Sequence, residues 1–330
     1  MTRVRIGIAS WNTAELLDHC LAALPAAAAG LDFDVVVVDN DSADDSVAVA
    51  QRHQHVVVVA NPDNTGYARA MNQALRHDGG GPAPDVLIAL NPDTVPPPGS
   101  LTELVARLLA DPTVGLVVPQ LANLDGSLQH SVYRFPSPLI TFIICTVPVR
   151  LQRGRLAQRF WLEGKVPHDQ ACDIDWAIGA VHVMRAEAVG PGLPYNQRWF
   201  MYVEDMDLCW QLGQQGWRIR LEPSAHVVHV GNAAGQQAWG NTRNTRWWQA
   251  TYDWVRFRRG VGAVHRYATI NTIGVWVLLQ VQRVRRRLLG RRAHDATVRI
   301  NDLAQMLPLH IAMMRAPRTT FDPEAGTSAP

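Results

Sequence analysis

Three carboxylates lie within four residues of a stretch that is otherwise aromatic and apolar. They are Glu204, Asp205 and Asp207 of the segment WFMYVEDMDLCW. At helical spacing Asp205 heads the apolar face, whereas Glu204 and Asp207 fall on the opposite face. A partly desolvated carboxylate has a raised pKa, which makes Asp205 a candidate general base. The alternative is that these acids only complement the dipole of a helix start.

Polar residues follow the apolar runs in the first hundred positions. Ligands of an open parallel sheet bind outside the carboxyl ends of the strands, so these residues are candidates for a nucleotide site. They occupy positions 10–12, 39–42, 61–66 and 91–94. A Gly-x-Gly-x-x-Gly fingerprint and a Gly-x-x-x-x-Gly-Lys loop are both absent, which argues against ordinary dehydrogenases and P-loop enzymes.

Two strand-end aspartates suit a nucleotide diphosphate. Asp39 can accept a hydrogen bond from a base or ribose, and Asp93 can ligate a divalent ion that bridges the phosphates. Each also has a structural alternative, because acids and Asn-Pro-Asp sequences are common in turns. Further along, the alternation of 225–231 sends His226 and His229 to opposite faces of a strand, so only one of them can reach a given site.

The elements that must position these residues alternate between strand and helix. Apolar runs predict strands at 4–9, 33–38, 56–60, 85–90, 115–119, 181–185, 217–221 and 225–231. Amphipathic patterns predict helices at 13–24, 44–53, 67–76, 100–110 and from 204 onward. This order predicts an α/β fold with a doubly wound, mostly parallel central sheet and helices on both faces.

Composition sets broad limits on the protein. The 330 residues are 47% hydrophobic and 18% charged, with a net charge of only +2, so overall charge indicates no partner. The four cysteines form no Cys-x-x-Cys pair, so we expect neither a zinc site nor a disulfide framework. We expect no signal peptide before the first strand, and no apolar run of this sequence is long enough to span a bilayer. We therefore expect a cytoplasmic protein, or one attached to a membrane face.

The last hundred residues differ in character from the rest. Residues 256–292 contain ten arginines and no acid, and apolar residues between 277 and 289 follow helical spacing. A basic amphipathic helix suits an anionic membrane surface. Nucleic-acid binding and a merely solvated face are the alternatives. The apolar segment 136–148 is either a core segment or a lipid-contacting loop.

Four segments, in order, resemble motifs of the bacterial family-2 glycosyltransferases, closest to the rhamnosyltransferase-like branch. They are 35–42 (VVVVDNDS), 64–72 (NTGYARAMN), 90–93 (LNPD) and 200–209 (FMYVEDMDLC). The resemblance implies a GT-A fold with a nucleotide-sugar half at 1–95 and an acceptor-binding and catalytic half at 96–232. A helical Arg/Trp-rich extension with a disordered tail would then occupy 233–330.

The resemblance also implies roles for individual residues. Asp205 is the implied catalytic base, and Asp93 and His229 are the implied ligands of Mg or Mn. Donor binding is implied for Ser10, Asn12, Asp39, Asn40, Ser42, Asn64, Gly66, Arg69, Asn72 and Asn91, and acceptor binding for Trp176, Gly179, Ala180 and Glu204. Asn91 replaces the first acid of the family's Asp-x-Asp motif, which predicts weaker metal affinity.

The implied reaction is inverting transfer of a sugar, with rhamnose from dTDP-rhamnose as the expected donor. The implied acceptor is a hydroxyl of a lipid-linked saccharide in cell-wall or surface polysaccharide assembly, at the inner face of the plasma membrane. We expect no nucleic-acid partner. The alternatives are a UDP-sugar donor (galactose, galactofuranose or N-acetylglucosamine), a non-catalytic membrane-surface protein, and a nucleotidyltransferase, against which the missing lysine-bearing loop argues.

Overall fold

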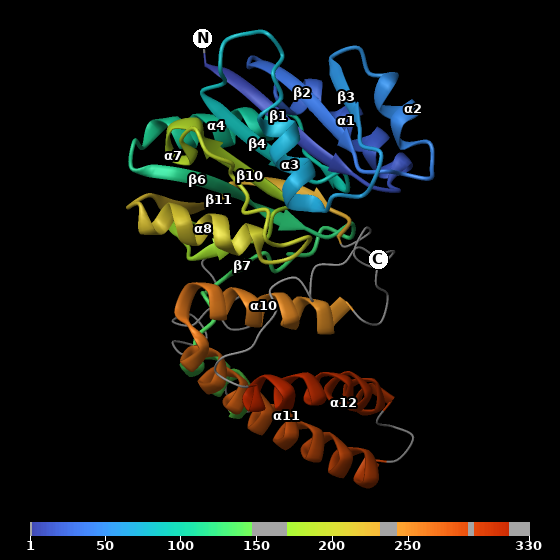
Figure 1. Ribbon diagram of the computed structural model, residues 1–330. Coiled ribbons are helices and arrows are strands. Elements are labelled where there is room, and N and C mark those ends of the chain that lie inside the picture. The colour runs from blue at the N-terminus through green and yellow to red at the C-terminus, as the bar shows by residue number, and fades with distance from the viewer. Residues whose placement is uncertain (1, 147–169, 232–242, 290–293, 317–330) are drawn as a thin grey trace. The chain divides into compact units, whose positions relative to one another are not determined.

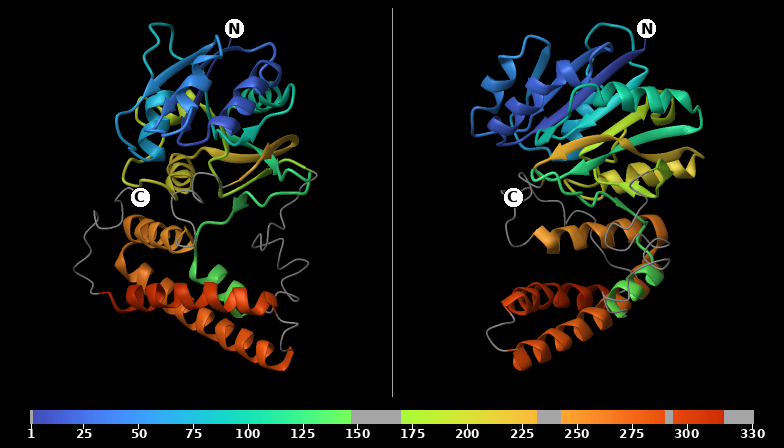
Figure 2. Two further views of the ribbon diagram at one scale, coloured as in Figure 1. Left: turned by 90° about the vertical axis from the view of Figure 1, so that its right-hand side faces the viewer. Right: turned by 180° about the vertical axis from the view of Figure 1, so that it is seen from behind.

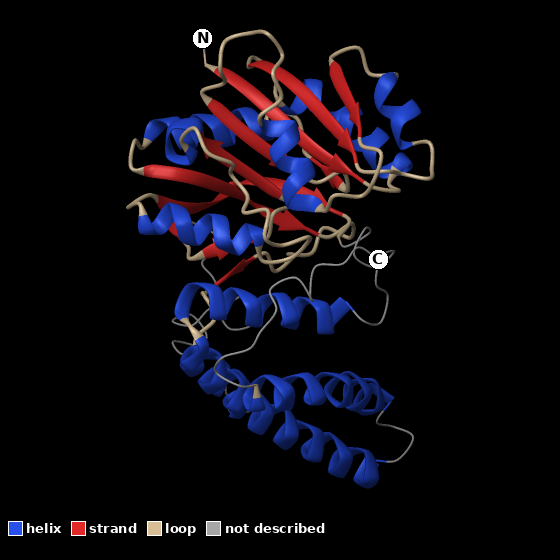
Figure 3. Cartoon of the chain, viewed as in Figure 1, coloured by secondary structure: helices blue, strands red, loops and turns tan. Residues whose placement is uncertain are grey.

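The computed structural model describes residues 2–146, 170–231, 243–289 and 294–316, which form two compact units. The first unit comprises 2–134 and 170–231 and contains the described strands (Figure 1). The second comprises the described residues from 135 to 146 and from 243 to 316, all of its regular elements being helices (Figure 3).

The first unit is built on a nine-stranded sheet with the order β3-β2-β1-β4-β10-β6-β11-β5, in which β8 also pairs with β11. The strands are β1 (Arg3–Ser10), β2 (Asp32–Asp39), β3 (Val56–Ala60), β4 (Val86–Leu90), β5 (Thr94–Val95), β6 (Val114–Ala122), β8 (Cys172–Asp173), β10 (Val181–Arg185) and β11 (Arg218–His229). A separate pair is formed by β7 (Val132–Tyr133) and β9 (Trp176–Ala177).

Helices cover both faces of this sheet (Figure 3). In the first unit they are α1 (Ala14–Ala27), α2 (Ser46–Gln51), α3 (Tyr67–Leu75), α4 (Ser100–Ala110), α7 (Ala186–Val189) and α8 (Glu204–Gln214). One core joins α1 and α4 to alternate strand residues such as Ile6 and Val35, and α3 packs on the other face against Val36 and Val38. Both faces are buried, which is why the strands read as continuous apolar runs rather than alternating ones.

The predicted fold class is confirmed, and two details differ from expectation. β10 runs antiparallel between β4 and β6, although the remaining long strands are parallel. The prediction of separate strands at 217–221 and 225–231 was wrong, because both belong to β11. The register of β11 shifts between Glu222 and His226, where Pro223 has no N–H to donate to the ladder.

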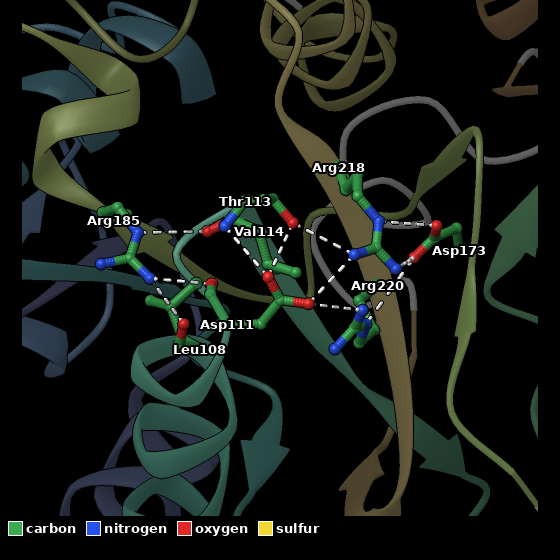
Figure 4. Close-up of polar contacts among 8 residues, drawn as sticks. All are labelled: Leu108, Asp111, Thr113, Val114, Asp173, Arg185, Arg218 and Arg220. Atoms are coloured by element: carbon green, nitrogen blue, oxygen red, sulfur yellow. Dashed lines mark hydrogen bonds and ion pairs between the residues drawn. The ribbon is translucent and has the colours of Figure 1, made fainter.

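A cluster of ion pairs fastens the beginning of β6 and β11 (Figure 4). Asp111 accepts hydrogen bonds from Arg218 and Arg220 at 3.0 and 2.9 Å, and Arg218 also reaches Asp173 of β8 at 2.8 Å. Arg185 of β10 donates to the carbonyls of Leu108 and Val114. The cluster lies at the opposite end of β11 from His229.

The second unit consists of α5 (Pro138–Thr146), α10 (Arg243–Arg259), α11 (Val261–Leu289) and α12 (His294–Arg315). α11 contacts the other three helices, and α5 lies along it in both views of Figure 2. A buried polar chain links three of the helices: Asn271 donates to Tyr252, whose hydroxyl lies 2.8 Å from His310. No helix among the described residues is long and apolar enough to cross a membrane.

Candidate active site at the carboxyl edge of the sheet

The strand ends of the first unit converge on one edge of the sheet, and main-chain hydrogen bonds link their loops. Asn40 N donates to Ser10 O at 2.8 Å, which joins the ends of β1 and β2. Asn91 N donates to Ala180 O at 2.9 Å, and Val230 N to Asp93 O at 2.9 Å. These bonds bring together the loop regions that the sequence predicts for donor, metal and acceptor.

Asp39 lies at the end of β2 with only 2% of its surface exposed. Its Oδ2 accepts a hydrogen bond from Ser42 N at 3.0 Å, and Ser42 Oγ in turn accepts one from Asn12 N. The second oxygen, Oδ1, is buried and has no hydrogen-bond partner within the described chain. A buried carboxylate oxygen without a donor is costly, so it suits a ligand that brings an N–H or O–H.

Other predicted donor residues are engaged by the protein itself. Asn40 donates to Asn64 at 2.8 Å and accepts from Thr65 N at 3.1 Å, so it holds the loop after β3. Asn72 forms two hydrogen bonds with the main chain of Tyr195, at 2.7 and 2.9 Å. The side-chain amides of Asn40 and Asn72 therefore hold neighbouring segments of the protein in place. Arg69 is exposed, and Ser10 contacts the hydroxyl of Thr13.

Gly66 allows the loop after β3 to touch the segment that leads to α8. Its φ is +84°, and a Cβ there would lie 2.5 Å from the carbonyl oxygen of Phe200. That carbonyl accepts a hydrogen bond from Tyr67 N at 2.8 Å. Only glycine permits this close approach, and the contact joins the second motif of the sequence to the last one.

Asp93 and His229 meet across the edge between β5 and β11. Asp93 Oδ1 lies 3.3 Å from His229 Nε2, and both side chains are 7% exposed. Asn91 adds a buried Oδ1 that, like His229 Nε2, has no hydrogen-bond partner within the described chain. No group of three His, Cys, Asp or Glu side chains converges in the described part of the protein. Asp93 and His229 therefore place one carboxylate oxygen and one imidazole nitrogen side by side, a pair that fits a divalent ion of the Mg or Mn type, and the buried Asn91 Oδ1 is a further candidate ligand.

Asp205 sits in the first turn of α8, directly after a strained turn. Tyr202 and Val203 both adopt positive φ values, 71° and 62°. A β-branched residue in this conformation costs on the order of 1–3 kcal/mol. The turn directs Asp205 toward the loop before β10, where its Oδ2 accepts a hydrogen bond from Gly179 N at 3.1 Å. Strain of this kind is characteristic of functional sites.

Burial raises the pKa of Asp205 from 3.8 to about 6, against the opposing effect of hydrogen bonds from Met206 N and Gly179 N. Burial also raises the pKa of neighbouring Glu204 well above its ordinary value, and the negative charge of Asp205 adds to this rise. Burial therefore disfavours the charged form of both carboxyl groups. Carboxyl groups with raised pKa values at a ligand site are candidates for acid–base chemistry.

The prediction that Asp205 alone faces the apolar side of the helix was wrong in one respect. Glu204 and Asp207, on the opposite face, are 5% and 0% exposed, so that face is buried as well in the first turn. Asp207 accepts a hydrogen bond from the side chain of Gln211 at 3.0 Å, which compensates its burial. What distinguishes Asp205 is its contact with Gly179 at the ligand edge rather than its position on an apolar stripe.

Two of the predicted acceptor residues, Glu204 and Gly179, adjoin Asp205 directly. Gly179 is in contact with Asp205, and Ala180 is the last residue before the antiparallel strand β10. Trp176 stacks on Tyr133 with ring centroids 4.8 Å apart. Tyr133, Tyr67 and Gln129 were not predicted from the sequence. Tyr67 donates to Gly179 O at 3.1 Å, and Gln129 contacts His229; only the position of Tyr67 within a motif could have indicated it.

We expect Gly66→Ala to lower the free energy of unfolding by roughly 3 kcal/mol, because the added Cβ meets Phe200 as well as an unfavourable φ. Gly30→Ala is the matched control, since Gly30 has a φ of +83° but nothing within 4 Å of the place that a Cβ would take, and we expect a loss of roughly 1 kcal/mol. Urea unfolding measures both losses. Equal losses would show that the contact with Phe200 is unimportant.

We expect Asp205→Asn to be more stable than the wild type at pH 8. A raised pKa means that ionisation of Asp205 opposes folding, and the penalty grows as the pH rises from 3.8 through about 6. At about 1.4 kcal/mol per pKa unit, the full penalty is about 3 kcal/mol. Chemical denaturation at pH 5 and pH 8 should show the larger difference at pH 8. A variant less stable than the wild type at both pH values would contradict a desolvated carboxylate.

Known proteins resemble this chain in both sequence and fold. The family model described as glycosyl transferase family 2 matches residues 6–169. The N-acetylglucosaminyl-diphospho-decaprenol L-rhamnosyltransferase of Mycobacterium tuberculosis is 27% identical over 243 residues, which cover 67% of this chain and 78% of the relative. The rhamnosyltransferase WbbL of Escherichia coli is 24% identical over 149 residues, which cover 44% of this chain and 52% of WbbL.

Among solved structures, the mannosyltransferase PcManGT from Pyrobaculum calidifontis, in complex with GDP-Man and Mn2+, aligns with a TM-score of 0.55 at 15% identity. The alignment covers 94% of this chain and 87% of that one, and at this identity it shows the GT-A fold alone. The family match, the relatives and the fold agree with one another. This chain belongs to the family-2 glycosyltransferases and is a glycosyltransferase that resembles the rhamnosyltransferases.

Proposed function

We propose that the protein is an inverting glycosyltransferase that transfers rhamnose from dTDP-rhamnose to a hydroxyl group of a lipid-linked saccharide. The observation that carries the proposal is the half-buried Asp205, held by Gly179 N at the ligand edge of the sheet with a pKa of about 6. The names of the two rhamnosyltransferase relatives support the choice of sugar, and the decaprenol-linked substrate in one of those names supports the choice of acceptor. Cell-wall or surface polysaccharide assembly is the proposed setting.

The donor would bind along the ends of β1, β2 and β4. Asp39 Oδ1 would accept a hydrogen bond from an N–H or O–H of the nucleoside, and the hydrogen bond from Asn12 N to Ser42 Oγ joins the loops after β1 and β2 beside it. Asn91, Asp93 and His229 would hold the divalent ion, and PcManGT was crystallised with Mn2+. Such an ion supplies positive charge for the departing diphosphate. Because position 91 is an asparagine rather than an acid, Asp93 is the one carboxylate among these three proposed ligands.

The acceptor would approach from the side of Trp176 and Gly179. Asp205 takes the proton of the attacking hydroxyl, because it is an ionised carboxylate at that edge and Gly179 N fixes the direction of its oxygens. The hydroxyl oxygen forms a bond to the anomeric carbon on the face opposite the leaving diphosphate. One displacement of this kind inverts the anomeric configuration. We assign the base role to Asp205 rather than to Glu204, because Asp205 is the carboxylate that Gly179 N holds at this edge.

The direct test is incubation of the protein with Mg or Mn, a lipid-linked N-acetylglucosamine acceptor and a panel of dTDP-, UDP- and GDP-sugars. We expect release of nucleoside diphosphate from dTDP-rhamnose, and loss of that release in Asp93→Ala. Release from a UDP-sugar instead would identify the alternative donor, and release of pyrophosphate would indicate a nucleotidyltransferase. If the protein binds nucleotide but releases no nucleoside diphosphate with any donor and acceptor, the result would favour a non-catalytic binding protein.

We expect Asp205→Asn to reduce transfer by roughly 10²–10⁴-fold, the usual contribution of a general base. Binding of dTDP should stay within about twofold of the wild type, because the amide keeps the shape of the carboxylate. Asp32→Asn is the matched control, as Asp32 is an exposed acid at the opposite end of β2. Transfer by Asp205→Asn within a few-fold of that control would exclude the base role.

We also propose that the second unit binds the anionic inner surface of the plasma membrane. One face of α11 packs against its neighbours, and the opposite face carries large apolar side chains that are 37–79% exposed: Ile273, Trp276, Val277, Val281, Val284 and Leu288. At 100° per residue, exposed Arg283 and Arg285 fall on either side of this stripe. Apolar residues flanked by cations match a bilayer of anionic lipid, whereas a second copy of the helix would bring like charges together. Leu139 and Phe142 of α5 are also exposed.

The paired change Val277→Asp and Val281→Asp should weaken binding to phosphatidylglycerol-containing vesicles at least tenfold. Each exposed valine that enters the bilayer contributes on the order of 1–2 kcal/mol, and each introduced carboxylate is repelled by the lipid. Val57→Asp is the control, because Val57 is 43% exposed on β3 of the first unit. Co-sedimentation measures the effect, and equal vesicle binding by all three proteins would refute the membrane surface.

A further inference from the structure

His229 is held by a glutamine that no motif indicates. Gln129 Oε1 lies 2.6 Å from His229 Nδ1, and Gln129 Nε2 donates to the carbonyl of the same histidine at 3.2 Å. The glutamine reaches His229 across 100 residues of chain, from the turn that follows β6. Its main-chain N–H donates to Leu121 O at 2.9 Å, which fixes that turn to the end of the strand.

The donor and the acceptor of each side-chain hydrogen bond in this turn can be assigned in sequence, starting from Asp125. Asp125 is a carboxylate that can only accept, and Ser127 Oγ donates to it at 2.6 Å. Ser127 Oγ therefore accepts from Asn123 Nδ2, at 2.9 Å. This leaves Asn123 Oδ1 to accept from Gln129 Nε2 at 3.0 Å. The orientation of the Gln129 amide follows, with Oε1 toward the histidine.

An amide oxygen is only an acceptor, so the proton of the neutral imidazole must lie on Nδ1. His229 Nε2 then presents a lone pair toward Asp93 Oδ1, 3.3 Å away. Two acceptors at this distance repel each other unless a cation or a proton lies between them. A divalent cation bound by both atoms would remove this repulsion, and carboxylate oxygen and imidazole nitrogen are both ligands that such ions accept.

We propose that Gln129 is a positioning residue for the metal site, and that the turn of Asn123, Asp125 and Ser127 orients it. Gln129 fixes the tautomer and ring angle of His229, so that Nε2 faces the ion together with Asp93. The hydrogen-bond partners of histidine ligands commonly set metal affinity in this way. This inference rests on the proposed metal site and adds a residue that does not itself touch the ion.

The test is the affinity of the purified full chain for Mn2+ in the presence of dTDP, measured by electron paramagnetic resonance. We expect Gln129→Met to weaken Mn2+ binding about tenfold or more, because the side chain keeps its length but loses the acceptor. Gln129→Glu keeps an acceptor beside Nδ1, and we expect its affinity to stay within about threefold of the wild type. Gln211→Met is the control, since Gln211 also donates to a side chain but lies on α8, and we expect wild-type affinity.

A second readout is the ¹⁵N spectrum of histidine-labelled protein without metal, with the His229 signals assigned from the spectrum of His229→Asn. We expect the Nδ1–H tautomer in the wild type and a mixture of tautomers in Gln129→Met. Mn2+ binding by Gln129→Met equal to that of the wild type would overturn the role of Gln129 while leaving the metal site intact. Absence of Mn2+ binding by the wild type, or binding unchanged in Asp93→Ala, would overturn the metal site itself. Thermal unfolding of each variant separates loss of folding from loss of affinity.

Discussion

The hydrogen bond from Gly179 N to Asp205 Oδ2 is the interaction on which the site depends. It joins the loop before β10 to the first turn of α8, and it directs a carboxylate that burial has made more basic. Several features that cost conformational free energy allow this hydrogen bond to form. Tyr202 and Val203 adopt a left-handed backbone conformation, and Gly66 lacks a side chain that would collide with Phe200. The desolvation of Asp205 and Glu204 opposes folding, and the large apolar core on both faces of the sheet offsets it.

Three groups of residues with different proposed roles lie along the same edge of the sheet. In the proposed function, the buried Oδ1 of Asp39 would bind the nucleoside, Asp93 and His229 would hold the cation, and Asp205, beside Gly179, would face the acceptor. The antiparallel strand β10 makes this arrangement possible. Its first residue pairs with the last residue of β4, so the loop that holds Gly179 ends at the same edge as Asn91. A parallel strand in that place would have brought its other end, with Arg185, to the ligands.

Much of the fold could be predicted from the sequence, because buried parallel strands are continuous apolar runs. The strands at 56–60 and 181–185 and the helix at 100–110 have the predicted bounds. The direction of β10 could not be predicted, since periodicity does not reveal which neighbour a strand pairs with. The single strand β11 was missed because Pro223 and Ser224 interrupt its pattern, and only the pairing with β6 shows that the chain continues.

The location of the candidate site could be predicted from the sequence, but the contacts of its side chains could not. Strand-end residues identify the edge, and the resemblance to a family singles out Asp39, Asp93 and Asp205. Neither shows that Asn40 and Asn72 use their amides on the protein, or that Glu204 and Asp207 are buried. Gln129 is invisible for the same reason, because a glutamine in a polar turn has no signal until the fold brings it to His229.

The most direct measurement of the base role is the pH dependence of kcat/KM for sugar transfer, with nucleotide binding measured at each pH as a control. We predict that kcat/KM falls about tenfold per pH unit below an apparent pKa of about 6, which belongs to the coupled pair of Glu204 and Asp205, and is constant above it. A profile that stays flat from pH 5 to pH 8, with nucleotide binding intact, would contradict the assignment of Asp205 as the base.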